Sequence, residues 1–106
     1  MDKGSALEII ERFRTILESK NVKIKKIILF GSYAKENYNA GSDIDVIVLS
    51  DDFAPMNYWE RIDLISEVIY EIFEPIEAVS FTPEEWGKSD SFLVDYARDG
   101  EVIYAA

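Results

Sequence analysis

The chain has 106 residues, a net charge of −10 and neither cysteine nor histidine. A chain of this length accommodates one modest core, so residues 1–106 are expected to form a single domain. The acidic charge argues against a nucleic-acid partner, because nucleic-acid surfaces use Lys and Arg to neutralise phosphates. Without cysteine and histidine, catalysis can use only carboxylates, hydroxyls, lysines or a bound cation.

No apolar run approaches the roughly 18 residues that a membrane-spanning helix needs, so no membrane partner is expected. No signal peptide is recognisable at the start, and the expected location is the cytoplasm. Hydrophobic residues at 48% and charged residues at 30% indicate a folded chain rather than a disordered one.

The first half of the chain predicts two helices and two strands. Ser5 and Glu8 form a capping box, and apolar residues recur at helical spacing after them. A glycine follows the apolar run that ends at Phe30, which indicates the end of a strand. The expected elements are a helix over residues 5–19, a strand ending at residue 30, a short helix over 32–36 and a strand over 43–50.

The second half predicts three helices and two strands. Asn57 with Glu60 indicates one helix start, and Thr82-Pro83-Glu84-Glu85 indicates another. The helix after Asn57 carries a stripe that is expected to face the core: Trp59, Ile62, Ile65, Ile69, Ile72 and Phe73. The other expected elements are a strand over 76–81, a short helix through Trp86, a helix after Ser89 to about Arg98 and a strand over 101–104.

This order of elements predicts an α+β (α/β) fold with a small mixed sheet of about four strands. The helices are expected to pack mainly on one side of that sheet.

Two aspartates at the start of the second strand supply the main chemical signal. Side chains alternate faces along a strand, so Asp43 and Asp45 are expected to point the same way, roughly 6–7 Å apart. Such carboxylates repel each other unless a cation lies between them, and Mg²⁺ prefers these oxygen ligands together with phosphates. Glu77 in the third strand is the candidate for a third carboxylate, although it could instead lie on a sheet edge or pair with a lysine.

A glycine turn provides the second signal. Gly31-Ser32 lies between a strand and a helical turn, an arrangement that lets backbone amides and a hydroxyl approach a phosphate. Lys35, one turn further on, could reach the same phosphate or be an ordinary exposed lysine. Together with Asp43 and Asp45, this turn could hold a nucleoside triphosphate between backbone and metal.

These residues resemble the signature of the nucleotidyltransferase superfamily that includes DNA polymerase beta: Gly31-Ser32, ten residues, then Asp43-x-Asp45. The short chain resembles most closely the minimal nucleotidyltransferases (MNT), the antitoxin partners of HEPN-domain ribonuclease toxins. The likeness extends from the first helix to the last strand, and the two-part signature is its specific element.

The resemblance implies transfer of AMP from ATP to a hydroxyl, with a tyrosine of a cognate HEPN toxin as acceptor. By position, Asp43, Asp45 and Glu77 would be the catalytic residues that hold Mg²⁺, and Glu77 would also help the acceptor lose its proton. Gly31, Ser32 and Lys35 would bind the triphosphate. Glu77 replaces the commoner aspartate, and Glu36 stands where relatives often have glycine, so that a carboxylate could approach the phosphates.

Two alternatives remain open at this point. One is a binding module of the same fold that neutralises a toxin by contact alone, and the other is a nucleotidyltransferase acting on a small molecule. The sequence leaves undecided the base specificity, the number of AMP groups transferred, and whether the chain forms homo- or hetero-oligomers.

Overall fold

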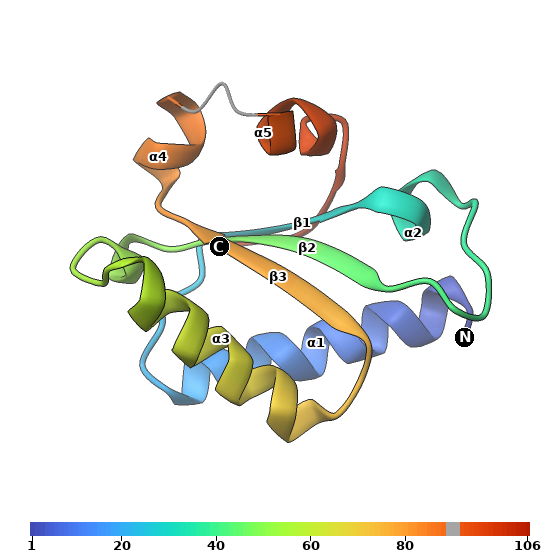
Figure 1. The fold of residues 1–106 in the computed structure, drawn as a ribbon, viewed down its shortest axis with the longest axis horizontal. Helices are drawn as coiled ribbons and strands as arrows, with labels where there is room; N and C mark the ends of the chain where they lie inside the picture. The colour runs from blue at the N-terminus through green and yellow to red at the C-terminus, as the bar shows by residue number, and fades with distance from the viewer. Residues whose placement is uncertain (89–91) are drawn as a thin grey trace.

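The computed structural model describes residues 1–88 and 92–106. Its elements follow the expected order (Figure 1): α1 Lys3–Ser19, β1 Lys26–Phe30, α2 Gly31–Lys35, β2 Ile44–Leu49, the 3-10 turn η1 Asp51–Phe53, α3 Tyr58–Ile72, β3 Ile76–Phe81, α4 Pro83–Lys88, α5 Phe92–Ala97 and β4 Glu101–Ala105. The predicted start of the fifth helix, after Ser89, falls outside the described residues.

The four strands form one mixed sheet in the order β3-β2-β1-β4. β1 pairs antiparallel with both β2 and β4, whereas β2 pairs parallel with β3. The two inner strands, β1 and β2, are almost wholly buried, and β3 and β4 are the edges. The predicted small mixed sheet of an α+β fold is therefore confirmed.

Helices cover the two faces of the sheet unequally (Figure 1). The long helices α1 and α3 lie together on one face, where Ile44, Val46 and Val48 of β2 join the larger core. The short helices α4 and α5 lie over the opposite face, where Ile47 and Leu49 belong to a smaller apolar cluster. This arrangement agrees with the expectation that helices pack mainly on one side, and it leaves the second face only partly covered.

Helix starts are set by side-chain caps, with one difference from the prediction. α1 begins at Lys3, because the Asp2 side chain accepts a hydrogen bond from the Ser5 backbone at 2.8 Å. The predicted Ser5–Glu8 capping box is therefore wrong, and an earlier acidic cap takes its place. The helix start predicted from Asn57 and Glu60 is confirmed, since Asn57 caps α3 and the two residues form a capping box.

The predicted inward stripe of α3 is wrong at Trp59, Ile62 and Phe73, which are 69%, 36% and 86% exposed. Ile65, Val68 and Ile72 are buried. α3 is apolar around more than half of its circumference, so helical spacing alone could not decide which apolar side faces the sheet.

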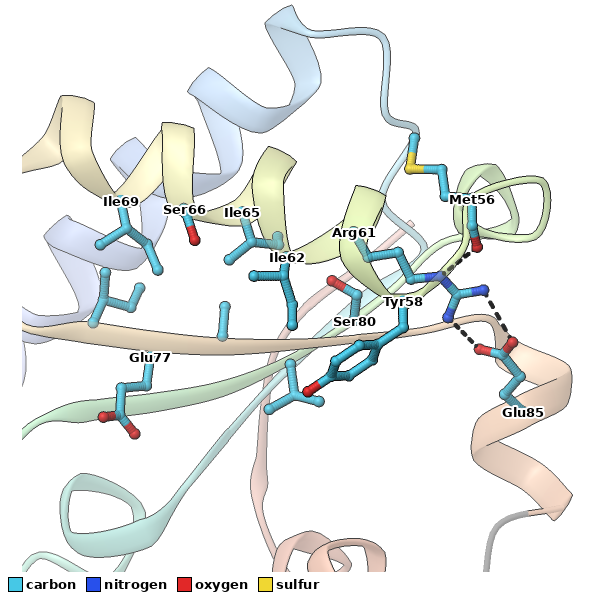
Figure 2. Close-up of a pocket in the computed structure, with 13 residues that line it drawn as sticks. Met56, Tyr58, Arg61, Ile62, Ile65, Ser66, Ile69, Glu77, Ser80 and Glu85 are labelled. Atoms are coloured by element: carbon cyan, nitrogen blue, oxygen red, sulfur yellow. Dashed lines mark hydrogen bonds and ion pairs between the residues drawn. The ribbon is translucent and has the colours of Figure 1, made fainter.

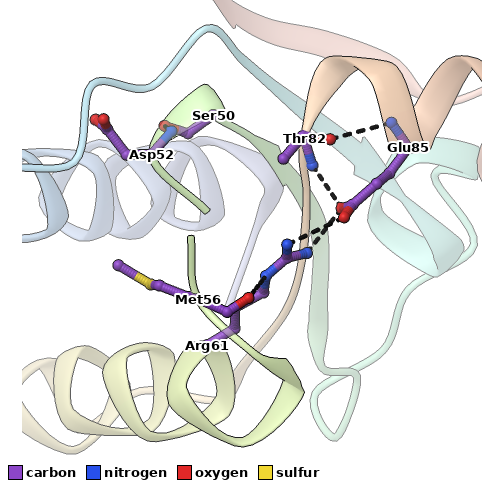
Figure 3. A network of polar contacts seen from close by, with 6 residues as sticks. All are labelled: Ser50, Asp52, Met56, Arg61, Thr82 and Glu85. Carbon is purple, nitrogen blue, oxygen red and sulfur yellow. Dashed lines mark hydrogen bonds and ion pairs between the residues drawn. The ribbon is translucent and has the colours of Figure 1, made fainter. Parts of the chain in front are cut away.

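A polar clamp ties α3 to the turn between β3 and α4 (Figure 3). Arg61 donates two hydrogen bonds to the Glu85 carboxylate, at 2.7 and 3.0 Å, and its Nε donates to the Met56 carbonyl. Thr82 and Glu85 cap each other's backbone, as the sequence predicts. The hydrogen bonds from Arg61, then that from the Thr82 backbone amide and the charge of Arg61, lower the pKa of Glu85 below its usual value. Within the described residues, no helix is long and apolar enough to cross a membrane.

Candidate active site

The candidate site begins at the turn from β1 into α2, where Gly31 has a φ of +72°. This is the left-handed region that glycine adopts without steric cost. A Cβ placed on Gly31 would also overlap the carboxylate of Asp45, with Oδ2 as its nearest atom. Glycine is therefore required twice, by the backbone angle and by the closeness of the Asp45 side chain.

Strand pairing brings Asp45 and Glu77 side by side. Asp45 of β2 is paired with Glu77 of β3 in the parallel ladder and with Phe30 of β1 in the antiparallel one. Residues in register on neighbouring strands point to the same face of a sheet. In Figure 2 the Glu77 side chain points away from α3, towards the face that carries α2. The structure thus brings Glu77 next to Asp45, which itself lies against the Gly31 turn.

The surroundings of Asp45 raise the pKa of its carboxyl from 3.8 to about 6. Burial is the largest cause, followed by the charges of Glu77 and Asp43 and a hydrogen bond with the Glu77 side chain. Burial and neighbouring negative charges each disfavour the ionised form of a carboxyl. The fold therefore concentrates negative charge at a point where a bound cation would relieve the repulsion.

Asp43 lies outside the β2 ladder, in contrast to the prediction that the strand begins there. β2 begins at Ile44, whose backbone amide donates to the Pro75 carbonyl at 2.8 Å. Asp43 is exposed, and its charge acts on Asp45. Pairing to β3 therefore fixes Asp45 and Glu77 but not Asp43.

The donor atoms fit a magnesium ion in chemistry, because Mg²⁺ takes carboxylate oxygens together with water and phosphate. Among residues 1–88 and 92–106, however, no group of three acidic side chains is already arranged to hold a metal ion. The Asp45–Glu77 pair is in place, and Asp43 would have to complete the set from its exposed position.

The predicted phosphate ligands lie on α2. Ser32 is half-buried in its first turn, and Lys35 is its exposed last residue. Lys35 and Gly31 share a cavity of about 270 Å³, whose other lining residues are Phe30, Ala34, Asp95, Asp99 and Gly100. Sequence reasoning missed Asp95 and Asp99, because residues about sixty positions away in the chain give no local signal of this proximity.

Glu36 ends α2 in the left-handed conformation, with a φ of 60°. Glycine is favoured at such helix ends. The Glu36 side chain is 71% exposed and lies 3.8 Å from the Lys3 ammonium. The Glu36 carboxylate thus has the Lys3 ammonium as a cationic neighbour.

Residues 10–98 match the family model of the nucleotidyltransferase domain. A relative from Methanocaldococcus jannaschii, provisionally named a protein adenylyltransferase, is 35% identical over 98 residues, which cover 90% of this chain and 94% of the relative. The chain belongs to the nucleotidyltransferase family, and its expected class of activity is thereby confirmed.

Solved structures share this fold at low sequence identity. A Sulfolobus solfataricus crystal structure, provisionally described as a nucleotidyltransferase, superposes with a TM-score of 0.74 at 18% identity, covering 97% of this chain and 83% of that one. A toxin–antitoxin structure solved with AMP-PNP superposes with a TM-score of 0.63 at 21% identity, covering 91% of this chain and 73% of that one. A complex of tri-AMPylated Shewanella oneidensis HEPN toxin with MNT antitoxin gives a TM-score of 0.54 at 20% identity, covering 92% of this chain and 73% of the matched chain. At these identities the likeness is evidence of the fold.

Proposed function

We propose that this protein is an antitoxin that transfers AMP from ATP to a protein hydroxyl, with a tyrosine of a cognate HEPN-domain toxin as acceptor. The observation that carries the proposal is the Asp45–Glu77 pair set against the Gly31 turn. A half-buried Asp45 and an exposed Glu77 beside a glycine turn suit a metal-bound triphosphate. In this proposal residues 1–106 act as one domain in the cytoplasm.

Asp43, Asp45 and Glu77 would hold Mg²⁺. When bound, magnesium would neutralise phosphate charge and assist in-line displacement. The Gly31 backbone, Ser32 and Lys35 would bind the β- and γ-phosphates.

The reaction joins the acceptor oxygen to the α-phosphorus and breaks the bond to pyrophosphate, which leaves with its electron pair. The proton of the acceptor hydroxyl passes to Glu77. Glu77 suits this role because its strand is an edge of the sheet, where a second protein has access. The residues of the chain therefore supply orientation, charge balance and a proton acceptor.

The choice of a protein acceptor is supported by the relatives. The Methanocaldococcus relative carries the name of a protein adenylyltransferase, and one structure of the same fold contains an AMPylated toxin beside its antitoxin. The net charge of −10 makes a polyanionic acceptor less suitable than a basic protein.

A non-catalytic antitoxin is the second candidate. It is favoured by one observation, namely that within residues 1–88 and 92–106 no three acids are arranged in advance for a metal ion. In that case the fold and its acidic surface would neutralise the toxin by contact alone.

The test is calorimetric titration of Mg²⁺ and ATP into the wild-type protein, Asp45→Asn and Asp63→Asn. Asp63 is an exposed acid on α3 and serves as the matched control for loss of one charge. We expect the wild type and Asp63→Asn to bind alike and Asp45→Asn to bind much more weakly. Transfer of label from α-labelled ATP to a co-expressed HEPN toxin should follow the same order.

Toxin neutralisation without label transfer, equal for all three proteins, would favour the non-catalytic antitoxin. Equal binding of Mg²⁺ and ATP by wild type and Asp45→Asn would refute the assignment of the site.

A further inference from the structure

A groove of about 570 Å³ runs between α3 and the outer edge of β3 (Figure 2). Glu77 is one of its lining residues, but the Glu77 side chain points away from α3. The walls of the groove are mainly apolar. They include Tyr58, Ile62 and Ile69 of α3 and Ile76, Ala78 and Ser80 of β3. Tyr58 is 67% exposed and Ile62 is 36% exposed, so the wall formed by α3 keeps large apolar side chains in contact with water. Exposed apolar surface beside a groove is typical of a protein-binding site.

The floor of this groove is the free edge of the sheet. Among residues 1–88 and 92–106, β3 pairs with β2 on one side only. The Pro75 and Phe81 carbonyls accept from the Ile44 and Ser50 amides of that side. In a parallel ladder the backbone groups of alternate residues point to alternate sides. Ala78, three residues from both Pro75 and Phe81, therefore directs its backbone N–H and C=O outward, where another strand can pair with them.

Charge around the groove selects the kind of partner. Residues 57–88, which include α3, β3 and α4, contain eight acids and two basic residues, Arg61 and Lys88. Arg61 is engaged by Glu85 at one end of the groove, and Lys88 by Glu84. A second copy of the chain would bring two such acidic surfaces together. A segment that bears Lys or Arg would instead be attracted.

We propose that this groove binds an extended, basic segment of the acceptor protein, which adds a fifth strand to the sheet at β3. The proposal rests on the proposed function, because it identifies how the acceptor of that reaction docks. Main-chain hydrogen bonds to β3 provide the register, and apolar side chains on one face of the segment fill the groove.

Strand addition would also deliver the acceptor to the site. Side chains of the added strand alternate between the groove face and the face that carries Glu77. Neighbouring strands are about 5 Å apart, so a tyrosine on the second face lies next to Glu77. Docking on one face of β3 thus positions a hydroxyl on the other.

The probe is a synthetic nine-residue peptide with Val at the even positions, Tyr at the centre and Lys at the remaining odd positions. As a strand it presents Val to the groove and Tyr to Glu77. We expect Ile62→Lys to weaken its binding by about tenfold or more, through lost apolar burial and added positive charge. Tyr70→Lys, an equally charged change at an exposed α3 residue outside the groove lining, should bind like the wild type.

Three further measurements make the test specific. A peptide with Glu in place of Lys, and one with N-methylated alternate amides, should both bind at least about tenfold more weakly. Bound peptide should protect the Ala78 amide from hydrogen exchange. Thermal melting of Ile62→Lys and Tyr70→Lys verifies that both variants are folded.

The outcomes separate docking from catalysis. Equal binding by Ile62→Lys and Tyr70→Lys, or undiminished binding of the N-methylated peptide, would overturn the inference even if Mg²⁺ and ATP bind. Dimerisation of the wild type that Ile62→Lys abolishes would overturn it in favour of a self-interface. Peptide binding in the groove without transfer of AMP to its tyrosine would support the docking and contradict the proposed function.

Discussion

Replacing Asp45 with asparagine should stabilise the metal-free protein near neutral pH. The substitution keeps the size of the side chain and removes a charge that lies next to Glu77 in a partly buried position. An asparagine amide can donate a hydrogen bond to the Glu77 carboxylate, which an ionised aspartate cannot do.

The magnitude follows from the raised pKa of Asp45. A value of about 6 against the ordinary 3.8 corresponds to about 3 kcal/mol, at roughly 1.4 kcal/mol for each pH unit between them. Because the side chain is only partly buried, solvent screening reduces this to about 2 kcal/mol. For a chain of this size the melting temperature should rise by about 8 °C.

The sign of the pH dependence is fixed by the direction of the pKa change. The folded wild type holds the Asp45 proton more tightly than the unfolded chain, so its stability falls as pH rises between about 4 and 6. Asp45→Asn has no titratable group at this position, so its stability does not fall in this way as the pH rises. The advantage of the variant should therefore be small near pH 4 and complete above about pH 6.

The assay is urea unfolding of the wild type, Asp45→Asn and the surface control Asp63→Asn, with a chelator, at intervals from about pH 4 to pH 8. The control should stay within about 0.5 kcal/mol of the wild type at every pH. A constant difference between wild type and Asp45→Asn across this range, or a less stable variant at pH 7.5, would refute the reasoning. Added Mg²⁺ should reduce the advantage of the variant by stabilising the wild type alone.

Two other substitutions test the backbone of the site. Glu36→Gly should raise the free energy of unfolding by about 1 kcal/mol, since it removes the side chain that opposes the left-handed conformation at this position; urea unfolding should show no such gain for Glu36→Ala. Gly31→Ala should cost about 2 kcal/mol or more, from its φ of +72° and the overlap with Asp45. An unchanged melting temperature for Gly31→Ala would contradict the close packing of this turn.

Much of the fold could be predicted because its signals are local. Alternation along β2 predicted that Ile44, Val46 and Val48 face one side of the sheet and Asp45 the other. In the structure these three apolar residues belong to the larger core, whereas Ile47 and Leu49, which alternate with them, belong to the smaller apolar cluster on the opposite face. The same alternation placed Asp45 and Glu77 on strands, although their roles as ligands stay predictions. The cap of α1 was missed because Asp2 and Ser5 are both good capping residues and only the chain path decides between them.

Contacts between distant segments could not be predicted in the same way. The apolar residues of α3 surround more than half of the helix, and the sheet covers one side because β3 is its edge. The groove beside Ile62 and the clamp from Arg61 to Glu85 both result from that placement. No sequence pattern predicts the groove or the clamp, because the residues that form them are brought together only by packing.

By itself, the sequence predicted the candidate site residues, a glycine turn and three acids, in a chain without cysteine or histidine. It could do so because turn and strand preferences depend on neighbouring residues. Only the tertiary structure decided that β2 and β3 lie parallel, so that Glu77 is beside Asp45, and that one edge of β3 stays open. Strand order and burial depend on the whole chain, and they set the charge repulsion at the site and the surface that a partner can reach.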